Sequence, residues 1–342
     1  ILKTEPLLTN YSISEEEEVD NLLSGVVIRK GRGQYLVQTE SGSRQCVISA
    51  LLRKKLVYPT ADPNSLEHYN VQRVDRIEMV GPLAVGDVVR FLDAGDGTGM
   101  IKAVEQRKSS LSRRDPGPIP LEQVLVANAD QMVAVFLAAR PKPSWRLLDR
   151  YLVLAEMAHL PAIICVTKMD LVKPQDQCQS IDVYRSLGHQ VIFTSTVSGQ
   201  GIERLRDALQ GRLSIFAGKS GVGKTSLLNA LQPDLGLRVK AVSHGKVGKG
   251  RHTTTLLEMF PLDGGGWVVD TPGMRELGFW DMDAQDIAAS FRELRPYLGK
   301  CKFGASCRHR TEPGCAVKQA VDNGAVHQQR YESYLVLAEE VG

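Results

Sequence analysis

Apolar residues recur along this chain with two different spacings, and the first gives way to the second near residue 121. In the first part short apolar runs alternate with polar positions, as at Tyr35–Thr39, which is typical of half-buried strands. Val88–Leu92 and Met100–Val104 flank a Gly-rich turn and predict a hairpin. About five such strands in roughly 80 residues predict a small barrel, and the OB-fold is the commonest nucleic-acid-binding version. An SH3-like barrel with a structural role is the alternative.

After residue 121 the pattern becomes one of alternating strands and helices. Ser144 is expected to cap a helix, because apolar residues from Leu147 to Ala155 recur at helical spacing behind it. Strands separated by helices predict a doubly wound, mainly parallel α/β sheet. The buried strands predicted are Met132–Ala138, Ala162–Thr167, Val191–Phe193, Leu213–Ala217 and Trp267–Val269.

These changes of pattern divide the chain into segments. The predicted segments are a flexible acidic arm at 1–23, an OB-fold RNA-binding domain at 24–114, a linker at 115–120, an α/β domain at 121–283 and a helical domain at 284–342. The arm contains the run Glu15–Glu18 and little hydrophobic pattern. The linker holds three prolines within Asp115–Pro120, so it continues neither a strand nor a helix.

The composition is that of an ordinary globular protein, with 43% hydrophobic and 24% charged residues. No stretch approaches the roughly 18 uninterrupted apolar residues of a membrane span, and the first residues show no secretory signal. Six cysteines, three scattered and three clustered near the end, suit a reducing cytosol and one metal site. We therefore expect a cytoplasmic protein with no membrane association.

The net charge of +3 conceals an uneven distribution of charge. Residues 1–23 carry six acidic residues and one Lys, whereas residues 24–118 carry fifteen basic and ten acidic residues. Residues 235–255 hold five basic and no acidic residues, and residues 295–330 hold seven basic and two acidic residues. Three separate basic zones favour a polyanion as partner, although ordinary solvated faces would give the same counts.

A phosphate-binding loop is the strongest motif in the chain. Residues 218–225 read GKSGVGKT and match G-x-x-x-x-G-K-[ST], with an apolar strand before them and a helix after them. The glycines let main-chain N–H groups wrap a phosphate, and the helix N-terminus adds partial positive charge. Lys224 is expected to reach the β- and γ-phosphates as a catalytic residue, and the Thr225 hydroxyl to bind Mg²⁺.

Magnesium and switch residues are expected downstream of this loop. Residues 268–273 read VVDTPG, in which Asp270 ends a buried strand and suits Mg²⁺, while the N–H of Gly273 suits a γ-phosphate. Residues 250–255 read GRHTTT in a basic loop, where Thr254 would bind Mg²⁺ only when the γ-phosphate is present. The alternative for the threonine run alone is the start of a β-branched strand.

Two further loops match elements that recognise guanine in GTPases. Residues 167–170 read TKMD after an apolar strand, and residues 194–201 read TSTVSGQG after the next one. The Asp170 carboxylate can accept from guanine N1–H and the exocyclic amine, a pairing that adenine does not offer. The Lys168 stem can lie over the purine. Thr stands at 167 where Asn is usual, and at 196 where Ala is usual; alone, TKMD would also fit a surface turn.

The order of these motifs is permuted. In ordinary GTPases the phosphate loop comes first, whereas here both base-reading loops precede it. A parallel sheet tolerates this, because all of these loops emerge at its carboxyl edge whichever strand begins the chain. The residues expected to bind the nucleotide are Thr167, Lys168, Met169, Asp170, Ser195, Thr196, Gly218, Lys219, Ser220, Gly221, Val222, Gly223, Lys224, Thr225, Ser226 and Gly273.

The clustered cysteines form a metal-binding pattern, C-x5-C-x-H-x5-C. Three thiolates and one imidazole suit a closed tetrahedral site for one structural Zn²⁺, with no open position for catalysis. Three buried thiols beside a surface histidine are the alternative. The expected ligands are Cys301, Cys307, His309 and Cys315.

Together these features resemble the circularly permuted, ribosome small-subunit-dependent GTPases of the RsgA or YjeQ family. The resemblance covers nearly the whole chain: the barrel, the linker, the permuted domain with GRHTTT and DTPG, and the Cys/His cluster. It implies an OB-fold, a structural Zn²⁺ and Mg²⁺ with GTP. It further implies weak GTP hydrolysis, stimulated by the small (30S) subunit during its late maturation. The implied partners are that subunit with its 16S rRNA, GTP and GDP, and other subunit assembly factors; we expect a monomer.

Hydrolysis by the protein alone is expected to be slow, on the order of 10⁻³ s⁻¹ or below, because Met274 stands after DTPG where Ras-like enzymes carry a water-orienting Gln nearby. We hypothesise that His252 positions the attacking water; contact with RNA or solvent is the alternative. No aromatic-rich surface is evident, so we expect recognition of folded RNA by shape. The expected RNA contacts are Arg29, Lys30, Arg32, Arg113, Arg114, Lys246, Lys249 and Arg251.

Two other functions stay open on the sequence alone. One is a P-loop ATPase with an accidental TKMD, which competition between GTP and ATP would reveal. The other is a nucleic-acid-binding zinc protein with a vestigial nucleotide pocket, which the intact Lys224, Thr225 and Asp270 disfavour.

Overall fold

The computed structural model describes residues 22–31, 33–57, 81–115, 121–137, 143–172, 179–235, 257–270 and 279–341. The chain divides into two compact units, the first made of Ile1–Ala129 with Gly250–Pro261 and the second of Asp130–Lys249 with Leu262–Gly342. Most of the predicted acidic arm and of the proline-rich linker lies outside the described residues. No helix within the described ranges has the length and apolarity to cross a bilayer.

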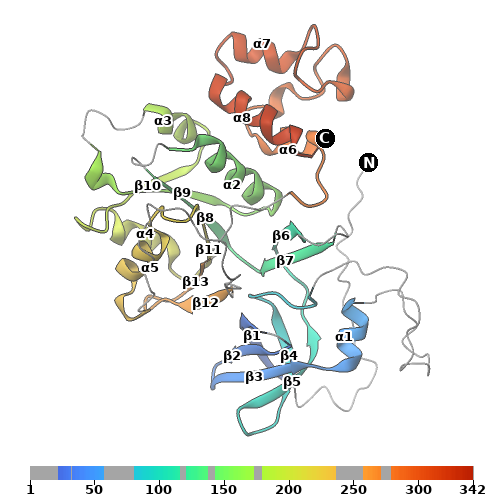
Figure 1. The fold of residues 1–342 in the computed structure, drawn as a ribbon, viewed down its shortest axis with the longest axis vertical. Helices are drawn as coiled ribbons and strands as arrows, with labels where there is room; N and C mark the ends of the chain where they lie inside the picture. The colour runs from blue at the N-terminus through green and yellow to red at the C-terminus, as the bar shows by residue number, and fades with distance from the viewer. Residues whose placement is uncertain are drawn as a thin grey trace, which may run out of the picture. The chain divides into compact units, whose positions relative to one another are not determined.

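A closed barrel forms the core of the first unit (Figure 1). Its strands run in the order β1-β2-β3-β5-β4, and β1 pairs with β4 to close the ring. Only β3 and β5 are parallel among these pairs, and a helix, α1, follows β3. This is the OB-fold arrangement, which confirms the prediction. The elements are β1 (Leu23–Lys30), β2 (Tyr35–Thr39), β3 (Gly42–Ile48), α1 (Ala50–Val57), β4 (Val88–Asp93) and β5 (Thr98–Val104).

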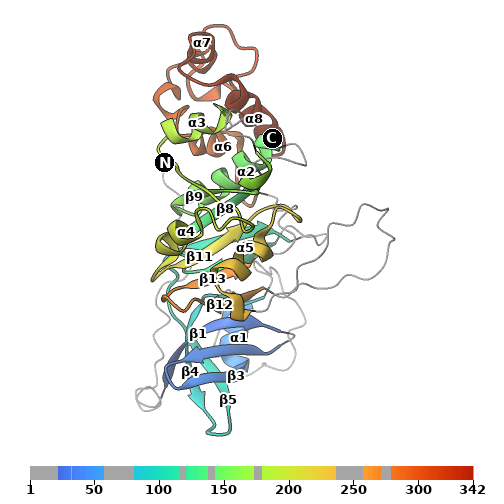
Figure 2. The same ribbon diagram turned by 90° about the vertical axis from the view of Figure 1, so that its left-hand side faces the viewer.

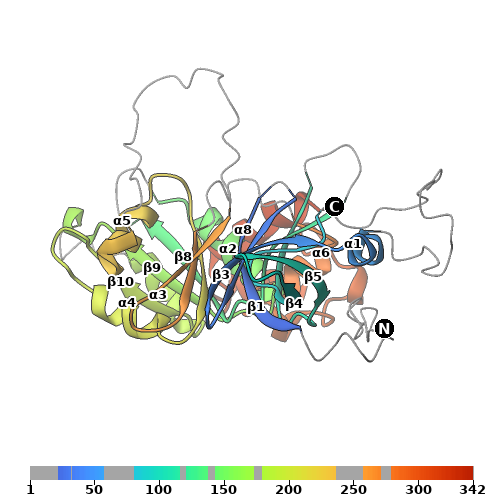
Figure 3. The same ribbon diagram turned by 90° about the horizontal axis from the view of Figure 1, so that it is seen from below.

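Alternation of side chains along these strands fills the barrel. Val27, Val37, Phe91 and Ile101 are fully buried in one cluster, while their neighbours in sequence are partly or fully exposed, except Ile28 at the irregularity in β1. Gly25 permits the close approach of β1 to β2, because a Cβ there would lie 2.5 Å from Cγ1 of Val37. Helix α1 lies beside β5 (Figure 3).

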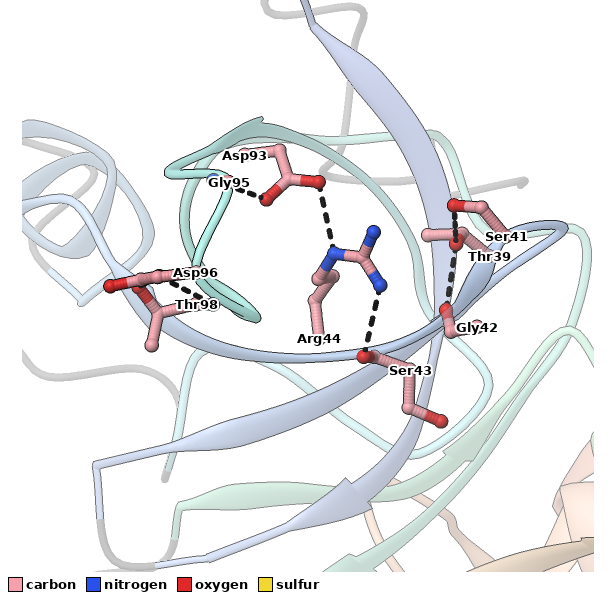
Figure 4. Close-up of polar contacts among 9 residues, drawn as sticks. All are labelled: Thr39, Ser41, Gly42, Ser43, Arg44, Asp93, Gly95, Asp96 and Thr98. Carbon is pink, nitrogen blue, oxygen red and sulfur yellow. Dashed lines mark hydrogen bonds and ion pairs between the residues drawn. The ribbon is translucent and has the colours of Figure 1, made fainter.

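Polar contacts hold the turn that joins β4 to β5 (Figure 4). Nε of Arg44 donates to Asp93 Oδ2 at 2.9 Å, and the N–H of Gly95 donates to the other oxygen of that carboxylate at 3.0 Å. Asp96 accepts from both the N–H and the hydroxyl of Thr98. The turn predicted from its glycines therefore exists, with aspartates completing its hydrogen bonds.

Two further elements complete the first unit. Strands β6 (Ser110–Arg114) and β7 (Glu122–Ala127) form an antiparallel ribbon. Strand β12 (Glu258–Pro261) pairs with β1, although the two are far apart in sequence. Arg107 donates twice to Asp87, at 2.7 and 2.8 Å, and Asp87 has no exposed surface. This buried ion pair holds the segment before β6 against the barrel.

A parallel sheet organises the second unit, as predicted. Its described strands lie in the order β10-β9-β8-β11-β13, and every neighbouring pair is parallel. Figure 2 shows β9, β8, β11 and β13 side by side. All residues of β8 and β11 are buried, and all of them except Gln131 and Ser214 are apolar. The strands are β8 (Gln131–Leu137), β9 (Ala162–Thr167), β10 (Gln190–Phe193), β11 (Leu213–Ala217) and β13 (Trp267–Asp270).

Helices connect these strands, and one predicted detail is wrong. Ser144 occupies the N-cap position of α2, but its side chain makes no capping hydrogen bond. Its main-chain oxygen instead accepts from the N–H groups of Leu147 and Leu148, so the first turn is closed by backbone. The helices are α2 (Trp145–Met157), α3 (Gln179–Ser186), α4 (Ile202–Leu209) and α5 (Lys224–Leu231).

The C-terminal part of the second unit is helical. Asp283 begins α6 through a capping box, accepting from the N–H groups of Gln285 and Asp286. Helices α6 and α8 pack against α2 (Figure 1), so this part shares a core with the sheet domain. The elements are α6 (Ala284–Ser290), α7 (Ala316–Asp322) and α8 (Gln328–Glu339).

Candidate nucleotide site and metal centre

The predicted phosphate loop connects β11 to α5 at the carboxyl edge of the sheet. Gly221 and Gly223 have φ values of +83° and +100°, in the left-handed region that favours glycine. Gly218 packs against the neighbouring strand, because a Cβ there would lie 2.7 Å from the main-chain oxygen of Val135. The glycines of the predicted phosphate loop are therefore needed for two reasons. Gly221 and Gly223 allow the backbone conformation, and Gly218 leaves space for the neighbouring strand.

Lys224 occupies the centre of this loop. Its side chain is buried, and Nζ donates to the main-chain oxygen of Gly218 at 2.6 Å. Burial lowers the pKa of Lys224, while the negative charge of Asp270 acts in the opposite direction. A phosphate in the loop would offer this ammonium a stronger acceptor than a neutral carbonyl.

The two predicted magnesium residues approach from neighbouring elements. Thr225 lies in the first turn of α5, and Asp270 ends β13. Since β13 runs parallel to β11, with Asp270 opposite Phe216, its carboxylate lies at the same sheet edge as the phosphate loop. The structure thus brings both predicted magnesium residues to the sheet edge that carries the phosphate loop.

The TKMD loop touches the phosphate loop directly. The hydroxyl of Thr167 donates to the main-chain oxygen of Val222 at 2.7 Å, with a longer contact of 3.2 Å to that of Phe136. Lys168 adopts a left-handed conformation, with φ of 60°, and its Nζ donates to Gly221 O at 3.3 Å. Three segments distant in sequence are joined here.

The second base-reading loop orients Asp170. Ser195 donates from its hydroxyl to Asp170 Oδ1 at 2.6 Å, and the same hydroxyl oxygen accepts from the N–H groups of Val197 and Ser198. Asp170 is itself exposed, so its carboxylate is available to a ligand while one oxygen is held in place. Thr196 is exposed beside it.

Sequence reasoning missed one residue of this loop. Gly201 has φ of +69°, and a Cβ there would lie 2.0 Å from the main-chain oxygen of Phe193. The loop therefore closes on its own strand only with glycine at this position. A glycine directly before an amphipathic helix was the available signal.

Several predicted site residues lie outside the described part of the chain. These are His252, Thr254, Gly273, Arg32, Lys246, Lys249 and Arg251.

The remaining predicted RNA contacts all belong to the first unit. Arg29 is exposed and pairs with Glu258 at 3.3 Å, whereas Nζ of Lys30 donates to Leu83 O at 2.8 Å. Arg113 and Arg114 end β6, and Arg114 is exposed. Arg114 and Arg29 thus present the most accessible cations of this group.

The four expected metal ligands come together. Cys301, Cys307, His309 and Cys315 are all buried, and their ligand atoms lie within 4.8 Å of one another. The two sulfurs of Cys301 and Cys315 are 3.8 Å apart, and each lies 3.4 Å from Nδ1 of His309. Zn–S bonds of about 2.3 Å in a tetrahedron place sulfurs about 3.8 Å apart, so the cluster fits such an ion.

The backbone around these ligands is held by two tyrosines of α8. His309 has φ of +58°, an uncommon conformation for a side-chain-bearing residue. Tyr331 donates its hydroxyl to His309 O at 2.6 Å, and Tyr334 donates to Arg308 O at 3.2 Å. Burial raises the pKa of the Cys307 and Cys315 thiols, so a cation is needed to hold them as thiolates.

Comparison with known proteins agrees with this geometry. A family model described as RsgA GTPase matches residues 104–280. The chain belongs to the RsgA GTPase family. It is 43% identical to the "Small ribosomal subunit biogenesis GTPase RsgA" of Gemmatimonas aurantiaca, covering 93% of this chain and 97% of that protein. It is 39% identical to the protein of that name from Chlorobaculum parvum, covering 94% and 99%.

Solved structures of the RsgA family show the same architecture. YjeQ from Thermotoga maritima superposes with a TM-score of 0.70 at 30% identity, covering 94% of this chain and 98% of that one. YloQ, described as a circularly permuted GTPase, superposes with a TM-score of 0.66 at 32% identity, covering 95% and 96%. These findings confirm the predicted family and the permuted order, and they make the protein a GTP hydrolase rather than an ATPase.

Proposed function

We propose that this GTPase assists the late maturation of the small (30S) ribosomal subunit. It binds the subunit through 16S rRNA, hydrolyses GTP slowly on its own, and is stimulated by the subunit. The main support is a phosphate loop joined to a guanine-reading loop by Thr167, in a chain whose relatives are named small ribosomal subunit biogenesis GTPases. The protein works as a cytoplasmic monomer, alongside other assembly factors.

The nucleotide binds across the loops at the sheet edge. Asp170, oriented by Ser195, accepts from the guanine edge, while Lys168 covers the purine. Lys224 and the N–H groups of the phosphate loop hold the β- and γ-phosphates. Met169, Thr196, Ser226 and Gly273 complete the pocket in this proposal.

Magnesium accompanies the triphosphate. Thr225 and Asp270 would hold this ion, and Thr254 would join them when GTP is bound. Mg²⁺ neutralises charge on the β- and γ-phosphates. His252 positions the attacking water when the subunit is bound.

The other segments serve recognition and stability. Residues 24–114 bind RNA, with Arg29, Arg113 and Arg114 contacting phosphates together with the basic residues of 238–251. Residues 1–23 form an acidic arm, 115–120 a linker, 121–283 the GTPase domain and 284–342 a domain held by one structural Zn²⁺. Binding through phosphates should weaken steeply with added salt.

Single-turnover GTP hydrolysis with purified small subunits tests the proposal. Small subunits should accelerate hydrolysis on the order of 100-fold or more, whereas large subunits should not. His252→Ala should keep GTP affinity and lose the acceleration. Hydrolysis unaffected by small subunits would refute the function, and undiminished acceleration of His252→Ala would refute the role of His252 alone.

A further inference from the structure

A buried ion network connects the metal-binding domain to the nucleotide-binding sheet. Arg330 of α8 is 3% exposed and donates to Asp149 of α2, which is fully buried. The same guanidinium forms a bidentate pair with Glu293, at 2.6 and 3.2 Å. Burial opposes the charge of Arg330, but Asp149 and Glu293 outweigh this and raise its pKa. The guanidinium is therefore a permanent charge fixed between α8 and α2.

Two aromatic rings lie close to this charge. The guanidinium lies 4.5 Å from the ring centroid of Phe291 and 5.3 Å from that of Tyr184 on α3. Tyr184 also donates its hydroxyl to Asp149 Oδ1 at 2.6 Å. Arg330 thus fills a position shaped for a planar cation that contacts two helices of the sheet domain.

On one side, α8 leads from Arg330 to the metal centre. The next residue, Tyr331, donates to the main-chain oxygen of the metal ligand His309, and Tyr334 one turn on donates to that of Arg308. Because all three side chains leave one short helix, a change in the metal loop would shift Arg330.

On the other side, contacts lead from Asp149 to the phosphate loop. Tyr184 stacks on Trp145 at 5.9 Å, and Trp145 packs on Phe136 at 4.8 Å. The main-chain oxygen of Phe136 accepts from Thr167, which also holds Val222 of the phosphate loop. A continuous series of contacts therefore joins the metal ligands to the nucleotide site.

We propose that Arg330 is a positioning residue that couples occupancy of the metal centre to nucleotide binding. This rests on the proposed function in requiring that the protein binds both a metal and a guanine nucleotide. Coupling of binding sites is reciprocal. Bound GDP should therefore tighten metal binding by the same factor by which the metal tightens GDP binding.

Chelator competition measures this coupling without reference to catalysis. In the full-length, Zn²⁺-loaded protein, GDP should raise the affinity for Zn²⁺ at least about fivefold, the low end of typical couplings. In Arg330→Met, GDP should raise the affinity for Zn²⁺ by less than about twofold. Glu340→Gln is the matched control, because it removes a more exposed ion pair between Arg150 of α2 and the C-cap residue of α8, and should keep the factor.

A second variant guards against misfolding. Arg330→Met leaves two buried carboxylates without their cation, which is strongly destabilising. The triple variant D149N/E293Q/R330M removes all three charges and keeps an acceptor for Tyr184, and should fold yet lose the coupling. Coupling retained in that variant, or absent from the wild type, overturns the inference and leaves the proposed function standing. Failure to bind either GDP or Zn²⁺ overturns both.

Discussion

The hydroxyl of Thr167 donates to the main-chain oxygen of Val222 at 2.7 Å, joining the loop that reads the base to the loop that binds the phosphates. Thr167→Val keeps the side-chain shape and removes this donor, leaving a buried carbonyl without it. A lost hydrogen bond of this kind costs about 1–2 kcal/mol, so GDP affinity should fall about 5- to 30-fold. Preference for guanine over adenine should remain, because Asp170 is unchanged.

Competition with fluorescent GDP checks this prediction. Thr167→Ser is the matched control, since it keeps the hydroxyl and should bind within about twofold of the wild type. Equal GDP affinity in Thr167→Val and the wild type would show that the contact does not shape the site.

Asp170 should determine the choice of base. Its carboxylate would accept two charge-assisted hydrogen bonds from guanine, and Asp170→Asn replaces one acceptor by a donor. GDP affinity should fall about 100-fold or more, while xanthosine diphosphate, which presents a carbonyl at that edge, should bind better to the variant than to the wild type. Titrating both nucleotides against each protein distinguishes altered selectivity from simple loss of binding.

Ser195→Ala tests how far orientation of this carboxylate matters. The Ser195 hydroxyl holds Asp170 Oδ1 at 2.6 Å, so its loss should weaken GDP binding only several-fold, on the order of 1 kcal/mol. Base preference should not change. A loss as large as that of Asp170→Asn would mean that Ser195 contacts the nucleotide itself.

Much of this site could be predicted from the sequence, because its motifs are local. Each strand end is marked in the sequence by an apolar run followed by polar or glycine residues. The permuted order of the motifs follows from their positions along the chain. The ligand spacing around Cys301–Cys315 likewise identified a cluster that the structure brings together. Each of these signals lies within about fifteen residues of chain.

Contacts between segments far apart in the chain could not be predicted, because no local sequence pattern marks them. Nothing in the spacing of Asp149 and Arg330 pairs them, since an ion pair imposes no periodicity on the sequence. The pairing of β12 with β1 likewise leaves no local signal, because Glu258 and the opposite Arg29 are 229 residues apart in sequence. Ser144 shows the converse, because a favourable cap residue was present and the main chain closed the helix instead.

Metal binding should depend steeply on pH. Burial raises the pKa of the Cys307 and Cys315 thiols, so binding Zn²⁺ as a tris-thiolate must release protons. The logarithm of the apparent Zn²⁺ affinity should therefore rise with pH with a slope of about three between pH 6 and 8. Chelator titrations at several pH values give this slope, and Cys315→Ser should reduce it to about two while lowering affinity. A slope near zero would exclude a thiolate site.

His189 should make the fold sensitive to mild acid. Its side chain is buried, and its Nδ1 has no hydrogen-bond partner within the described residues. Desolvation, reinforced by the charges of Arg292 and Arg330, lowers its pKa to about 4, although Glu156 and Glu293 act in the opposite direction. The unfolded chain therefore takes up a proton near pH 6.5 that the folded chain does not accept until about pH 4.

Because the unfolded chain is protonated at a higher pH than the folded chain, acid destabilises the fold. Between those two pH values the unfolded state binds more protons, so stability falls as pH falls, by about 2 kcal/mol from pH 7 to pH 5 for a shift of this size. His189→Gln removes the titrating group, and its free energy of unfolding should change by about 2 kcal/mol less over that range. Urea unfolding of both proteins at pH 7 and pH 5 measures the difference, in which contributions common to both proteins, including any loss of Zn²⁺ at pH 5, cancel. Parallel losses of stability in the two proteins would show that His189 keeps an ordinary pKa in the folded state.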